Sequence, residues 1–278
     1  MKVYIENIAL YAPGLDGWPL AKKTLASGLP FDLTPLEPYK PKMLPRNETR
    51  RSSSTVKMAF RIGEELVQES ARDFSECAAV FVSSGGDYAI IDQICGQLCT
   101  EEKHISPTRF HNSVHNAPAG YWAIAARSHK LSISISAYDD SFLFGLLEAL
   151  SVCESEQVDV LYIAYDMVPP FPLASARKIT HPFATGMLLT PYQSDDSAFF
   201  LSMAIGACEP ENKAGTRPGA PLMALYEANP IARSLPLLEL LAQNRTGDVL
   251  YCPTANDTGQ CYSFHVASLK GSGEEHGR

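Results

Sequence analysis

The sequence predicts an α/β fold in which a layered sheet of strands and crossover helices encloses a buried helix. Apolar runs at 78–84, 131–137 and 158–165 alternate with segments of helical periodicity. Such alternation is typical of βαβ crossovers, which cover both faces of a sheet. The segment 141–152 (SFLFGLLEALSV) is apolar on almost every side. We therefore expect it to be a helix that protein covers on several sides.

The remaining elements follow in chain order. Residues 3–10 are typical of a strand, and a helix is expected to begin near Pro19. The proline-rich stretch 30–45 predicts an ordered surface loop, because proline fixes φ and removes a backbone donor. Apolar positions at helical spacing predict a helix over 55–71. The later predictions are strand 78–84, helices 88–99 and 117–128, strand 131–137, helix 141–152, strands 158–165 and 198–205, a helix near 235–243, and strands 249–252 and 261–269.

Only Tyr138, Asp139 and Asp140 separate strand 131–137 from the apolar helix. The N-terminus of this helix should therefore lie at the carboxyl end of a buried strand. In open α/β sheets, chemistry tends to be placed at that edge.

Composition excludes several classes of function. The chain has 278 residues, of which 45% are apolar and 19% charged, so it can bury a sizeable core and is not disordered. No apolar run approaches the ~20 residues of a membrane span. The start MKVYIENIAL lacks the apolar region of a secretory signal, so we expect a cytoplasmic protein.

The net charge of −8 argues against a nucleic-acid partner, because neutralised phosphates supply most of that affinity. A local basic patch is conceivable, although a solvated face is the simpler interpretation of such a charge run. Its members would be Arg46, Arg50, Arg51, Lys57 and Arg61.

The seven cysteines are an odd number scattered along the chain, which does not resemble a disulfide framework. Cys95 and Cys99 share a helix face, but no second Cys/His pair completes a metal site, so buried thiols are the simpler interpretation. Cys153 follows the apolar helix, where the helix dipole disfavours a thiolate. His111 and His115 have the spacing of a metal pair without an evident third ligand. We expect neither a metal nor a cofactor.

The run 105–150 resembles the central block of the β-ketoacyl synthases, which have the thiolase fold. In that family an Ile-Ser-Pro segment leads to an Asn-x-x-Ala-Gly helix, matched here by Asn116, Ala119 and Gly120. A strand then presents the nucleophilic cysteine at the N-terminus of a buried helix. Residues 80–92 resemble the family's upstream strand and Gly-rich turn.

Residues 181–190 resemble the family's downstream segment, which precedes a strand, and 255–269 resemble its final hairpin. The resemblance implies one thiolase-like domain, 1–278, whose N-terminal half is 1–206. Residues 207–278 would then be a shortened remnant of the C-terminal half, with the second βαβ repeat truncated.

The chain departs from this family at the positions of the catalytic residues. The nucleophile position falls on Asp139, although the family's reaction needs a thiolate there. An aspartate could form only a mixed anhydride and would repel the oxyanion that the site must stabilise. A simpler role is that Asp139, Asp140 or Ser141 caps the following helix. The family's His-Gly-Thr motif and second catalytic histidine are both absent, so we expect no activity from the chain alone.

A ketosynthase-like chain without nucleophile and histidines resembles a chain length factor, in the small form of bacterial aryl polyene pathways. The resemblance implies a heterodimer with a catalytic ketosynthase, whose acyl tunnel ends against this chain. Because carrier proteins of this family are acidic and this chain has a net charge of −8, we expect the carrier protein to dock mainly on the ketosynthase. A pure scaffold subunit, or an acyltransferase or decarboxylase with a rearranged site, are the alternatives. The interface and tunnel candidates are Ile90, Ile91, Ile94, Arg109, Phe110, His111, Asn112, Val114, His115 and Asn116.

Overall fold

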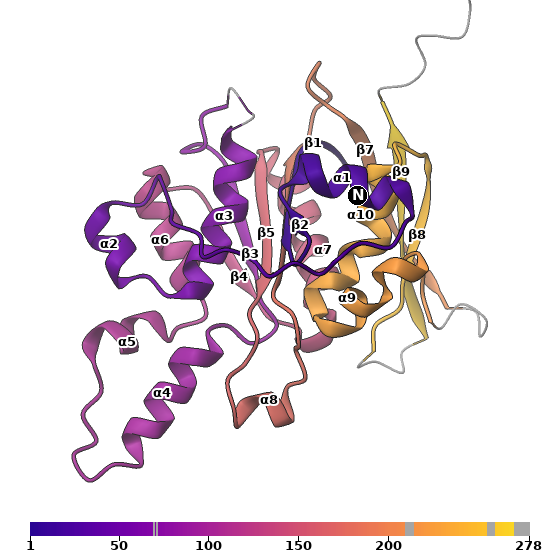
Figure 1. Ribbon diagram of the computed structural model, residues 1–278. Helices are drawn as coiled ribbons and strands as arrows, with labels where there is room; N and C mark the ends of the chain where they lie inside the picture. Colours follow the sequence, from indigo (N-terminus) through magenta and orange to yellow (C-terminus); the bar gives the residue numbers. More distant parts are fainter. Residues whose placement is uncertain (69, 71, 209–213, 255–258, 270–278) are drawn as a thin grey trace, which may run out of the picture.

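The computed structural model describes residues 1–278 except 69, 71, 209–213, 255–258 and 270–278 (Figure 1). Within the described residues one mixed sheet has the strand order β4-β3-β5-β6-β1-β7-β9-β8, and the short β2 pairs with β1. The strands are β1 Lys2–Ala12, β2 Leu15–Asp16, β3 Ala78–Val82, β4 Ser132–Ile135, β5 Val160–Asp166, β6 Phe183–Thr190, β7 Phe199–Ala207, β8 Gly247–Tyr251 and β9 Gln260–Ser268.

Helices pack on both faces of the sheet. The α-helices are α1 Trp18–Ser27, α2 Arg46–Arg51, α3 Ser54–Gln68, α4 Tyr88–Leu98, α5 Pro107–Asn112, α6 Ala117–Ala126, α7 Ser141–Glu156, α8 Leu173–Ala176, α9 Met223–Ala228 and α10 Leu235–Ala242. The short 3-10 turns are η1 Tyr138–Asp140, η3 Ala220–Leu222 and η4 Pro230–Ser234. No helix in the described part of the chain is both long and apolar enough to cross a membrane.

The strand order contains an internal repeat. β3 runs parallel to β4 and β5, whereas β5-β6-β1-β7-β9-β8 is antiparallel throughout. Moving outward from the pair β1 and β7, the order is β1-β6-β5 on one side and β7-β9-β8 on the other. In each half, the first strand is followed by the last strand of that half and then by the strand before it. Helix α7 leads into β5 and β6 on one side, and α10 leads into β8 and β9 on the other. Since the described residues contain no counterpart of β3 and β4 beyond β8, the second repeat is truncated, as the sequence predicts.

The core lies in two parts on opposite faces of the first half-sheet, which consists of β4, β3, β5, β6 and β1. α3 and α6 cover one face, and α7 packs on the other together with α10 and β7 to β9. Figure 1 shows α7 and α10 between β3 and β5 on one side and β8 and β9 on the other. The Phe142 ring of α7 contacts both Tyr162 of β5 and Tyr251 of β8. The prediction that α7 is covered on several sides is therefore confirmed.

Most predicted elements are present, with a few corrections. Residues 181–190 precede the strand β7, as expected, but residues 183–190 also form the buried strand β6, which was not predicted because an apolar run covered on both faces carries no alternation. β4 is the edge strand and is half-exposed, so the expectation of a buried strand before α7 is wrong. The helix predicted over 55–71 ends at Gln68, and residues 69 and 71 lie outside the described residues.

Candidate functional site

Asp139, which the resemblance places at the nucleophile position of the β-ketoacyl synthases, lies in the turn η1 before α7. Directly after β4 the chain turns sharply, and Tyr138 adopts a φ of 52°, a conformation that non-glycine residues seldom take. This turn places Asp139 in the wall of a cavity of about 760 Å³. Among the described residues that line this cavity there is no histidine.

Two arginines hold the Asp139 carboxylate. Arg177 Nη1 donates to Asp139 Oδ1, and Arg233 Nη2 lies 3.9 Å from Asp139 Oδ2. The Arg177 guanidinium also lies 3.9 Å from the centre of the Tyr138 ring, and its Nε donates to the Tyr88 hydroxyl at 3.2 Å. Burial disfavours this cation, yet the bonds to Asp139 and Tyr88 raise the pKa of Arg177 above its ordinary value. Asp139 is therefore the counter-ion of a mostly buried guanidinium.

The neighbouring polar groups do not cap α7, so that prediction is wrong. Asp140 occupies the cap position, but its carboxylate accepts from the Thr254 amide at 3.0 Å and from Arg233 Nη1 at 3.0 Å. Ser141 Oγ accepts from the Ala137 amide at 2.9 Å and donates to the Tyr138 carbonyl. The physical reason is that charge-assisted bonds to arginine compete successfully with the helix amides for these carboxylates.

This arrangement differs from the condensation site that the resemblance to the ketosynthases implies. Such a site needs a thiolate nucleophile at the helix N-terminus. Here that position carries a carboxylate that two guanidinium groups neutralise. Cys153, in the last part of α7, offers no substitute, because burial raises the pKa of its thiol to about 12.

The three isoleucines of α4 differ in their surroundings. Ile90 is 7% exposed, Ile94 is half-buried and Ile91 is exposed, so they do not form one buried face. Ile90 lines a second cavity of about 370 Å³, together with Arg109 and Asn112 of α5. The structure thus brings together three of the predicted tunnel residues around one cavity.

Asn112 fixes the position of α5. Its Nδ2 donates to the Arg51 carbonyl at 2.6 Å, and its Oδ1 accepts from the Tyr121 hydroxyl at 2.9 Å. His111 packs edge-on against the Tyr121 ring, whereas the His115 Nε2 lies 3.1 Å from the Ser83 carbonyl. These different partners give the two histidines separate packing roles.

The other predicted interface residues lie at the surface. Phe110, Val114 and Asn116 are exposed. In Figure 1 α4 and α5 extend from the body of the molecule, on the side where β4 ends the sheet. The predicted basic patch is partly neutralised, since Arg61 pairs with Asp16 and Glu65, and Arg51 pairs with Glu48.

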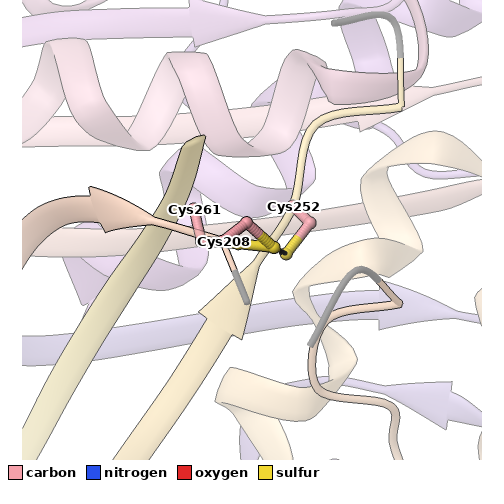
Figure 2. Close-up of a disulfide and its surroundings, with 3 residues drawn as sticks. All are labelled: Cys208, Cys252 and Cys261. Carbon is pink, nitrogen blue, oxygen red and sulfur yellow. Dashed lines mark hydrogen bonds between the residues drawn. A yellow bond between two sulfur atoms is a disulfide. The ribbon is translucent and has the colours of Figure 1, made fainter. Parts of the chain in front are cut away.

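The sequence analysis missed a cluster of three cysteines, Cys208, Cys252 and Cys261 (Figure 2). Their spacing in the sequence carries no signal, because only the register of β7, β9 and β8 brings them together. Arg177 and Arg233 were also missed, since each lies far along the chain from Asp139.

The comparisons decide the family. The family model described as beta-ketoacyl synthase, N-terminal domain, matches residues 27–246, which is more than half of the chain. The chain belongs to the β-ketoacyl synthase family. No curated protein matches the sequence significantly.

Solved structures of this family share the fold. A ketosynthase (ApeO) in complex with its chain length factor (ApeC) from Xenorhabdus doucetiae matches at 26% identity and a TM-score of 0.68. The match covers 95% of this chain and 99% of that chain. The ishigamide ketosynthase/chain length factor matches at 12% identity and a TM-score of 0.70, over 96% of this chain and 99% of that chain. The fold is therefore thiolase-like, in a truncated form.

Proposed function

We propose that this protein is a non-catalytic, chain length factor-like subunit that pairs with a catalytic ketosynthase. The observation that carries the proposal is the Asp139 carboxylate, which the family resemblance assigns to the nucleophile position and which pairs with Arg177 and Arg233. The 26% identical complex of a ketosynthase with its chain length factor supports it. By this analogy, the product of the complex is a polyene or a related chain built by fatty-acid-like steps.

The edge of the sheet at β4 is the proposed site of pairing. Within the described residues β4 has a strand neighbour on one side only, so its other edge offers free backbone donors and acceptors. Apolar side chains are exposed beside it, namely Ile124 on the neighbouring α6 and Leu131 directly before β4. An unprotected edge strand next to exposed apolar side chains is typical of an interface. We expect the heterodimer to bury more than ~2,000 Å², as permanent interfaces do.

The test is co-expression with a full-length ketosynthase, followed by the native mass of the purified complex. Leu131→Glu places a charge beside β4 and should weaken assembly at least tenfold. Leu20→Glu on α1 is the matched control, because Leu20 is 50% exposed and Leu131 47%. The proposal is contradicted if the chain remains a monodisperse monomer with every ketosynthase tested. It is also contradicted if Leu131→Glu and Leu20→Glu weaken assembly equally.

A role in limiting the acyl chain is the second part of the proposal. The cavity beside Ile90, Arg109 and Asn112 is lined by α4, by α5 and by the first turn of α3. If the partner's tunnel continues into this cavity, the Ile90 side chain limits the length of a rigid polyene. A pure scaffold that never meets the substrate is the competing function, and product lengths decide between the two.

The carrier protein is proposed to dock mainly on the ketosynthase. This chain carries a net charge of −8, and acidic carrier proteins associate slowly with acidic surfaces. The expected cytoplasmic location stays a prediction.

A further inference from the structure

Three cysteines meet at one end of the second half-sheet, which consists of β7, β9 and β8 (Figure 2). Cys261 of β9 stands opposite Gly206 of β7, and Tyr262 pairs with Tyr251 of β8. Cys252 follows Tyr251, so the antiparallel register continues to Cys261. On the other side, the Cys208 amide donates to the Gly259 carbonyl at 2.7 Å. Backbone pairing therefore sets Cys208 and Cys252 on the two sides of Cys261.

The sulfur atoms converge accordingly. The Cys252 Sγ lies 3.3 Å from the Cys208 Sγ and 2.6 Å from the Cys261 Sγ. In the structure Cys208 and Cys261 form a disulfide. The three Sγ atoms lie within 4.8 Å of one another. Tetrahedral zinc–thiolate geometry, with Zn–S near 2.3 Å, needs sulfur atoms about 3.8 Å apart. Reduction of the disulfide removes the bond that holds the Cys208 and Cys261 sulfur atoms closer than this spacing.

We propose that the reduced cluster Cys208, Cys252 and Cys261 is a zinc site with three thiolate ligands. A cellular dithiol reduces the disulfide to two thiols and is itself oxidised to a disulfide. Binding of one Zn²⁺ then displaces three protons from the three thiols. Thiolates are soft ligands that favour such metals over magnesium or calcium. This site is independent of the proposed length-limiting role.

The surroundings suit a three-thiolate site. Cys252 also lines the cavity beside Asp139, so water from this cavity can supply the fourth ligand that tetrahedral zinc takes. Burial raises the pKa of the Cys252 thiol, although the Gly215 backbone N–H opposes the shift. Zinc affinity should therefore rise with pH, because the ligand must lose its proton.

The experiment uses the full chain, purified with its ketosynthase partner if the two assemble. The protein is reduced with a phosphine, stripped with a chelator under anaerobic conditions and loaded with Zn²⁺ alone. We expect one zinc per chain by elemental analysis, and thiolate-to-metal charge transfer when Co²⁺ replaces Zn²⁺. Cys252→Ser should weaken binding at least tenfold. Cys99→Ser, an exposed cysteine elsewhere in the chain, is the matched control and should bind normally.

A second readout covers the case in which the variant fails to fold. In the wild-type chain, bound zinc should protect Cys208, Cys252 and Cys261 from alkylation while Cys95 and Cys99 react, as peptide masses will report. Less than one zinc per ten reduced chains, equal alkylation of all five cysteines with zinc present, or binding of Cu⁺ without Zn²⁺ overturns the proposal.

Discussion

Asp139→Asn tests whether the residue that we assign to the nucleophile position serves only as a counter-ion. The substitution keeps the shape of the side chain and an oxygen that can accept from Arg177, and it removes only the charge. Arg177 is 12% exposed, and its Nη2 is buried without a hydrogen-bond partner. The neutral variant would leave this guanidinium without its ion-pair partner, in contact with the amide oxygen, the Tyr88 hydroxyl and the Tyr138 ring.

The expected loss of stability follows from the burial of the pair. Removing one member of a fully buried ion pair costs about 3–5 kcal/mol, whereas exposed pairs contribute about 0–1 kcal/mol. The Asp139 side chain is 34% exposed, so water screens part of the charge that remains on Arg177. We therefore expect the free energy of unfolding to fall by about 1–3 kcal/mol, more than the loss for a surface pair.

The assay is urea unfolding of the chain alone, together with turnover of the assembled complex. Asp16→Asn is the matched control, because Asp16 also pairs with an arginine, Arg61, but is 55% exposed. It should cost less than about 1 kcal/mol. Turnover should be unchanged wherever Asp139→Asn assembles. Equal stability losses for both variants refute the electrostatic reasoning, and a hundredfold fall in turnover of an intact complex refutes the counter-ion role.

Two further predictions follow from the buried groups. Burial raises the pKa of Asp166 to about 6, despite bonds from Ser84 and Ser83, so the folded chain binds this proton more tightly than the unfolded chain. The stabilisation from this carboxyl is full below its ordinary pKa near 4 and lost as the pH rises through 6. The wild type should therefore gain up to about 3 kcal/mol relative to Asp166→Asn between pH 7 and pH 4, and a constant difference in denaturant titrations contradicts this. Asp139→Cys should bring no condensation activity to the isolated chain, because no histidine is among the described lining residues of its cavity; acylation followed by turnover in a malonyl-carrier assay contradicts it.

Local patterns predict most of the fold. The apolar runs of β3, β5 and α7 are strong signals, since β3 and β5 are buried along their length and α7 is buried over most of residues 141–153. β4 is different, because its alternation of serine and isoleucine is equally compatible with an edge or an interior position. Its place depends on the topology of the whole sheet, which no local pattern contains.

The site is predicted less completely for the same reason. The sequence locates Asp139 through its family block, but it does not indicate Arg177, Arg233 or the cysteine cluster. These partners come from loops and strands that the fold alone brings together. The capping prediction failed because it considered only neighbours in the sequence.

The most direct test of the central claim is the product length distribution of the heterodimer with Ile90→Ala. Ile90 lines the cavity beside α5, and truncation removes three side-chain carbons from its wall. Leu98→Ala is the control, since Leu98 lies exposed at the end of the same helix. We predict longer or more broadly distributed products from Ile90→Ala and an unchanged distribution from Leu98→Ala. An unchanged distribution from both, in complexes that assemble and turn over, would show that the chain is a scaffold and does not limit length.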